Sequence, residues 1–298
     1  STRPARGRQG GWQTRRMATG IVPPMLRPTI DELSAAEVRV LARLRLEMAA
    51  HLAAAATGAD PSLGAAMQRP FLLRISCPGC PPAYVACRRG GSPPGLAVTA
   101  SSAGGRPAGH VSLTLRFLSP SACARALSGA GGIPIPVPGG PGAGAALKWF
   151  RAAAPRAAAL IADTSFPVAS RARLMAVAAV RGIAAVGTAD AWLADRLAHV
   201  PDGSVAVVAD GSFSLGLETR GGRITASDAA PERPNARLEF ASPETALAVL
   251  SGKRQAVVAL GAGEVSIRGL LPLVQGLFGV LDRLAHYLAV GSAKGAGR

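Results

Sequence analysis

An internal repeat constrains the fold of this 298-residue chain more than any other feature. Residues 117–129 read FLSPSACARALSG and residues 240–252 read FASPETALAVLSG, so six of thirteen aligned positions are identical. Each segment has the pattern of a strand end, a serine N-cap, a proline in the first helical turn, a short helix and a terminating glycine. The repeat therefore predicts two copies of one folding unit.

Further similar blocks follow in the same order in both halves. VTAS at residues 98–101 aligns with ITAS at 224–227, and residues 84–86 align with residues 207–209. Phe117 and Phe240 are 123 positions apart, far above the period of a solenoid repeat, so two globular modules are expected. The predicted division is a basic extended arm at 1–30, a divergent module at 31–161, a second module at 162–290 and a tail at 291–298.

Hydrophobic periodicity predicts an α+β fold with helices and strands in each module. Apolar residues at three- and four-residue steps predict helices at 31–56, 143–161, 169–186 and 270–288. Prolines alternate with isoleucines at 133–137, which predicts an edge or irregular strand in the first copy. The helix that follows the repeat segment in the second copy has no counterpart in the first copy.

The second copy carries several local motifs of one known family. It reads VVADGSF at 207–213, ARLEF at 236–240, SGK at 251–253 and GEVSIRG at 263–269. In these segments it resembles the type-two sterol carrier protein, or non-specific lipid-transfer, family, and the first copy is a more divergent member of the pair. The resemblance implies that each module is a small, mainly antiparallel sheet covered by helices. In the family fold the sheet has five strands, and an apolar tunnel lies between the sheet and the helices.

The same resemblance implies a set of residues that line the tunnel and bind a sterol, phospholipid or acyl chain. The alternative interpretation is that these side chains fill a ligand-free core. The predicted lipid-binding residues are Phe240, Leu247, Leu250, Val257, Leu260, Ile267, Leu277, Phe278 and Leu281.

Charge is the second informative feature, because the chain has a formal net charge of +16. No acidic residue precedes Asp31, and an arginine-rich, acid-free segment resembles an organellar targeting sequence. We expect a mitochondrial protein, in the matrix or peripheral to the inner membrane, since the most apolar stretch, 270–281, is too short to span a bilayer. The predicted partner-binding residues are Arg3, Arg6, Arg8, Arg15, Arg16 and Arg27.

Catalytic and metal-binding patterns are weak or missing in the sequence. Cys77 and Cys80 have the spacing of half a zinc site, but no second such pair exists, so free thiols or a local disulfide are the alternatives. The GGPGAG segment at 139–144 lacks the Lys-Ser/Thr of a phosphate-binding loop. The sequence therefore predicts no enzyme activity, no catalytic residue, no metal and no cofactor other than a bound lipid.

Together these features predict a non-catalytic accessory or scaffold subunit of a large mitochondrial assembly, such as a respiratory or ATP synthase-type membrane complex. Its partners would be other protein subunits and anionic phospholipid. Two alternatives stay open. The first is a lipid carrier that uses the tunnel of the second module, and the second is a basic RNA-contacting subunit of an organellar ribosome.

Overall fold

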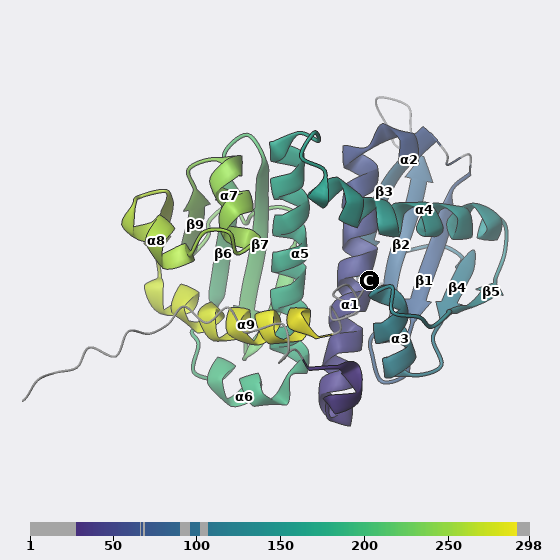
Figure 1. The fold of residues 1–298 in the computed structure, drawn as a ribbon, viewed down its shortest axis with the longest axis horizontal. Helices are drawn as coiled ribbons and strands as arrows, with labels where there is room; N and C mark the ends of the chain where they lie inside the picture. The colour runs from purple at the N-terminus through teal and green to yellow at the C-terminus, as the bar shows by residue number, and fades with distance from the viewer. Residues whose placement is uncertain (1–27, 66, 68, 90–95, 102–106, 291–298) are drawn as a thin grey trace, which may run out of the picture.

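The computed structural model describes residues 28–65, 67, 69–89, 96–101 and 107–290 (Figure 1). The predicted tail at 291–298 and all but the last three residues of the predicted basic arm lie outside these ranges. The arginines predicted to bind partners therefore lie outside the described residues too, namely Arg3, Arg6, Arg8, Arg15, Arg16 and Arg27.

The first sheet has five strands in the order β3-β2-β1-β4-β5. Its central pair, β1 and β4, is parallel, and the other pairs are antiparallel. The strands are β1 (Phe71–Ser76), β2 (Ala83–Arg89), β3 (Leu96–Ser101), β4 (Leu113–Arg116) and β5 (Ile135–Pro138). The proline-rich segment forms β5 at the sheet edge, where missing N–H donors do no harm.

The second sheet has five strands in the order β10-β9-β6-β7-β8. Read from the other side this order is β8-β7-β6-β9-β10, and again only the central pair, β6 and β9, is parallel. The strands are β6 (Gly203–Ala209), β7 (Phe213–Arg220), β8 (Arg223–Ser227), β9 (Ala236–Phe240) and β10 (Val265–Gly269). The two sheets thus share one topology, which confirms the predicted α+β class with two modules of similar build.

Helices occupy corresponding places in the two modules. α1 and α5 precede the sheets, α3 and α7 follow the fourth strands, and α4 and α9 follow the fifth strands. The second module has α8 between α7 and β10, but the first module passes directly from α3 to β5. The helices are α1 (Ala35–Ala59), α2 (Pro61–Ala65), α3 (Pro120–Leu127), α4 (Ala143–Ala162), α5 (Val168–Ala189), α6 (Ala191–Leu197), α7 (Pro243–Leu250), α8 (Ala256–Gly261) and α9 (Leu271–Ala289).

The repeated sequence segment forms the same capped helix twice. The Ser119 hydroxyl accepts a hydrogen bond from the Ala122 N–H at 3.1 Å, which satisfies a free donor at the start of α3. In α7, Ser242 caps the Thr245 N–H at 3.2 Å. Gly129 and Gly252 then end the two helices with a φ of 73°, a conformation that glycine adopts without steric cost.

The two modules meet along α1 and α5, which stand side by side in the middle of the molecule (Figure 1). α1 packs on the first sheet and α5 on the second, so their buried side chains join in one continuous hydrophobic core. The pairing is antiparallel, because Leu44 lies opposite Gly182 while the carboxyl-terminal His51 and the amino-terminal Val177 line one pocket. Gly182 permits close approach here, since a Cβ at that position would lie 2.9 Å from a methyl of Leu284 in α9.

One described helix is long and apolar enough to cross a membrane by length and composition, and it is α5, with a mean hydropathy of 1.4 over its most apolar window. The sequence had pointed to residues 270–281 instead. In the structure 67% of that window of α5 is buried inside the protein, between α1 and the second sheet. Its apolar character is therefore explained by packing in the core.

Replacing Gly182 with leucine tests the packing of α1, α5 and α9. The new side chain would overlap methyl groups of Leu284 and Leu44, so we expect a loss of about 1–3 kcal/mol in the free energy of unfolding, measured in urea. Gly279 in α9 is the matched control, because a Cβ there meets no atom within 4 Å. Equal stability of Gly182→Leu and Gly279→Leu would contradict this packing.

Candidate functional site

A small apolar cavity lies in the second module, between the helix-covered face of the sheet and helices α5, α7 and α9. Its volume is about 70 Å³, and every side chain that lines it is apolar. The lining residues are Ala176, Ala179, Val180, Ile183, Val205, Val207, Leu217, Leu238, Phe240, Leu250, Val274, Leu277, Phe278 and Leu281.

The periodicities of strand and helix place these side chains together. Val205 and Val207 are two residues apart in β6, so both point to the same face of the sheet. Val274, Leu277 and Leu281 recur at three- and four-residue steps along α9, which turns all three toward that face. The cavity is therefore the space left where the apolar stripes of three helices meet the apolar face of the sheet.

The structure brings five of the nine predicted lipid-binding residues together around this cavity: Phe240, Leu250, Leu277, Phe278 and Leu281. Leu247 and Ile267 are half-buried and pack against the core outside the lining. Val257 and Leu260 of α8 are 80% and 42% exposed and do not line it. The reason is local, because α8 is short and buries only Ala259.

Sequence reasoning missed the contribution of α5 and of β6 and β7 to the lining. The motifs of the sterol carrier family in the second copy begin at residue 207, after α5, so they do not indicate that α5 forms a wall of the tunnel. A signal was nevertheless present, since Ala176, Val180 and Ile183 follow the three- and four-residue spacing of one helix face. Their small and branched side chains leave room against the sheet.

The corresponding layer of the first module is occupied by aromatic rings. The rings of Phe71 and Trp149 have centroids 5.5 Å apart, and those of Trp149 and Phe150 are 6.4 Å apart. The indole N–H of Trp149 donates a hydrogen bond to Thr57 of α1 at 3.0 Å, so this buried polar atom is satisfied. Aromatic side chains therefore pack in the first module between its sheet, α1 and α4.

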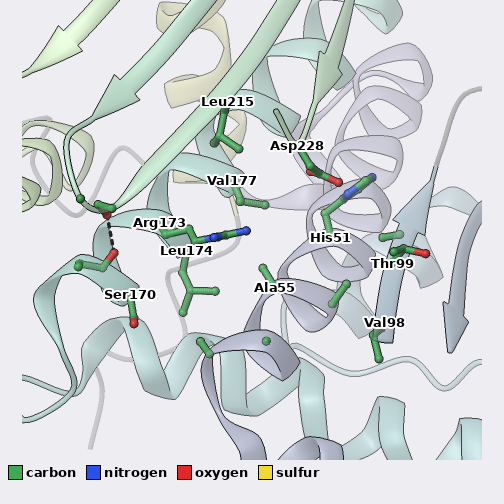
Figure 2. Close-up of a pocket in the computed structure, with 17 residues that line it drawn as sticks. His51, Ala55, Val98, Thr99, Ser170, Arg173, Leu174, Val177, Leu215 and Asp228 are labelled. Atoms are coloured by element: carbon green, nitrogen blue, oxygen red, sulfur yellow. Dashed lines mark hydrogen bonds between the residues drawn. The ribbon is translucent and has the colours of Figure 1, made fainter. Parts of the chain in front are cut away.

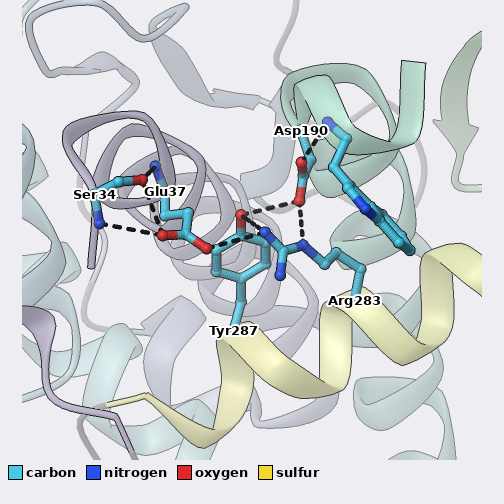
Figure 3. A network of polar contacts seen from close by, with 6 residues as sticks. Ser34, Glu37, Asp190, Arg283 and Tyr287 are labelled. Carbon is cyan, nitrogen blue, oxygen red and sulfur yellow. Dashed lines mark hydrogen bonds and ion pairs between the residues drawn. The ribbon is translucent and has the colours of Figure 1, made fainter. Parts of the chain in front are cut away.

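A polar network lies at one end of the α1–α5 pair (Figure 3), where its residues line a pocket of about 540 Å³. The guanidinium of Arg283 in α9 donates to Asp190 at 2.6 Å and to Glu37 of α1 at 3.0 Å. The Tyr287 hydroxyl also donates to Asp190, at 2.9 Å, and Ser34 bonds to Glu37 at the start of α1. Each of these charged groups has an opposite charge beside it, so we interpret the network as a structural link between the modules.

Two pKa values reflect this network. The Ser34 hydroxyl and N–H hold the pKa of Glu37 below its ordinary value of 4.5, and Arg283 adds to this effect. Burial raises the pKa of the Tyr287 hydroxyl, and its hydrogen bond to Asp190 raises it further. Both groups therefore keep their hydrogen-bonding states at neutral pH.

The four cysteines are free thiols. A hydrogen bond to Cys123 raises the pKa of Cys77 to about 12, which keeps its thiol protonated at neutral pH. Among the described residues, no group of three or more His, Cys, Asp or Glu side chains is arranged to hold a metal ion.

No family model and no curated protein sequence matches the chain. Solved structures of sterol carrier protein domains are similar to it, as the resemblance in the sequence predicted. A ubiquinone synthesis protein, UbiJ-SCP2, gives a TM-score of 0.29 at 16% identity, over 35% of this chain and 94% of that chain. Sterol carrier protein domain 2 of Helicoverpa armigera gives 0.31 at 15% identity, over 37% and 88%. Sterol carrier protein 2 from Yarrowia lipolytica, in its apo form, gives 0.26 at 13% identity, over 36% and 88%.

Acidification tests the link at Glu37. Because the folded pKa of Glu37 is depressed, its contribution to stability is present above pH 4.5 and is lost as the pH falls through the lower folded value. We expect Glu37→Gln to be less stable than the wild type at neutral pH and to lose less stability between about pH 5 and pH 3. Glu232→Gln, which removes an exposed carboxylate, should keep the wild-type profile; the same profile in both variants would contradict the role given to Glu37.

Proposed function

We propose that the protein is a non-catalytic lipid-binding protein whose second module takes up one apolar chain between its sheet and helices α5, α7 and α9. The observation that supports this proposal most directly is the lining of the cavity, which contains no polar side chain. A cavity with such walls offers water no hydrogen-bond partner and favours hydrocarbon. The ligand class is an acyl, prenyl or sterol body, since each presents hydrocarbon to such walls.

Uptake of such a ligand requires the cavity to widen. Its volume of about 70 Å³ is below the roughly 300–1,000 Å³ of ordinary ligand sites. Phe278 of α9 lines the cavity and is 44% exposed, which places it between the cavity and solvent. We expect α9 to move outward at Phe278, and exposed Val257 and Leu271 on α8 and α9 to supply apolar surface during entry.

A second candidate function is that of an accessory subunit in a larger assembly. It is favoured by the first module, whose core is packed with aromatic rings and whose edge strand β5 exposes Ile135 and Val137, after Ile133 at 86% exposure. An exposed apolar edge suits contact with another protein. A mitochondrial membrane complex as the assembly, and anionic phospholipid or RNA as partners of the basic arm, belong to this second proposal.

Filling the cavity tests the lipid-binding proposal. In Ala179→Leu the added side chain would occupy the cavity, so we expect at least about a fivefold loss in affinity for a fluorescent fatty acid such as cis-parinaric acid, with a melting temperature equal to or above that of the wild type. The matched control is Ala285→Leu, which adds the same side chain at an exposed position of α9.

Three outcomes separate the two candidates. Lipid extracted from the purified full chain and seen by mass spectrometry, together with an effect of Ala179→Leu alone, would support lipid binding. Equal affinity of Ala179→Leu and Ala285→Leu for the fatty acid, or no binding by the wild type, would overturn it. The accessory role is tested separately, by purifying the full chain from its native source. Co-purification with other proteins in fixed stoichiometry would support this role, and a free monomer would contradict it.

A further inference from the structure

A larger pocket lies where the two modules meet, at the end of the α1–α5 pair opposite the polar network (Figure 2). Its volume is about 520 Å³, within the range of small-molecule sites. The walls come from α1 and β3 of the first module and from α5 and the β6–β7 turn of the second module. Because both modules contribute, the pocket exists only in the tandem arrangement.

Part of the pocket wall is apolar, and small residues of α1 keep the pocket open there. Ala55 and Gly58 of α1 leave room where longer side chains would fill it. Leu174 and Val177 of α5, with Val98 of β3, supply larger apolar surfaces around that space (Figure 2). A compact hydrocarbon body can therefore lie between the two helices and β3.

His51 of α1 lines the pocket, but its Nε2 atom is too deeply buried to contact a molecule bound there. The side chain is 3% exposed, and its Nε2 atom has no hydrogen-bond partner among the described residues. Burial, and then the positive charge of Arg181, lowers the pKa of His51 to about 3, so the imidazole is neutral at neutral pH. His51 therefore adds no charge to the wall of the pocket.

The charges around the pocket leave one cation free for a ligand. Asp228 is neutralised by Arg181, whose guanidinium nitrogen lies 2.6 Å from its carboxylate. Arg173 of α5 is exposed, points into the pocket toward His51 and has no carboxylate partner among the described residues (Figure 2). The pocket therefore combines apolar surface with a guanidinium that has no carboxylate partner among the described residues.

We propose that this inter-module pocket binds a small organic anion with a compact apolar body, whose carboxylate pairs with Arg173. A guanidinium binds a carboxylate through two parallel hydrogen bonds, which gives this end its selectivity for charge. The site is separate from the apolar cavity of the second module, because the two share no lining residue. It also differs in ligand size, at about 520 Å³ against about 70 Å³.

The test uses the full chain and 6-hydroxy-2-naphthoate, a rigid aromatic carboxylate. Its binding is measured by titration calorimetry. The uncharged comparison ligand is the corresponding carboxamide. We expect saturable binding of the carboxylate below about 1 mM and binding of the carboxamide at least about tenfold weaker, since the carboxamide lacks the charge that pairs with Arg173.

Two variants locate the binding. Arg173→Gln removes the cation, and Gly58→Phe fills the pocket from a position where an added Cβ meets nothing within 4 Å. Each should weaken carboxylate binding at least about tenfold. The matched control is Gly144→Phe, which makes the same exchange at an exposed helical glycine of α4 with equally free space, and it should bind as the wild type does.

Absence of saturable binding, equal affinity for the carboxamide, or wild-type affinity in either Arg173→Gln or Gly58→Phe would overturn the proposal. Ala179→Leu should leave this binding unchanged, so failure here and failure of lipid uptake in the second module are distinguishable.

Discussion

The packing of α1 against α5 is the contact on which the rest of the structure depends. Each helix covers its own sheet with one face and meets the other helix with another, so two modules share one hydrophobic core. Alanine and glycine make this possible, because short side chains let two helices approach closely while each still reaches a sheet. Gly182 is an example of this close approach, because Leu44 of α1 and Leu284 of α9 both lie next to it.

The duplicated modules have diverged around that shared core. The first packs Phe71, Trp149 and Phe150 between its sheet and helices, and the second keeps an apolar cavity in the matching layer. The two ends of the α1–α5 pair differ in how their charged residues are paired. At one end the pocket is lined by the ion-paired Arg283, Glu37 and Asp190, whereas at the other end Arg173 has no carboxylate partner among the described residues.

Sequence patterns predicted the α+β class, the capped helices α3 and α7, the edge strand β5 and five of the cavity residues, because each rests on local spacing or on family motifs. They did not predict the pairing of α1 with α5. An alanine-rich helix has little contrast between its faces, so periodicity cannot say which partner it packs on. The sequence did not predict the inter-module pocket for a related reason. His51, Arg173 and Val98 are far apart in sequence, and they come together only because α1 packs against α5 and β3 lies beside α1.

Hydrogen exchange of the full chain in rising urea, read by mass spectrometry, tests the shared core most directly. Amides of α1 and α5 should become exposed together, at the urea concentration that unfolds the whole chain, because neither helix can lose its partner without opening both modules. Exchange of α1 at low urea, while α5 and the second sheet remain protected, would show two independent cores and contradict the account.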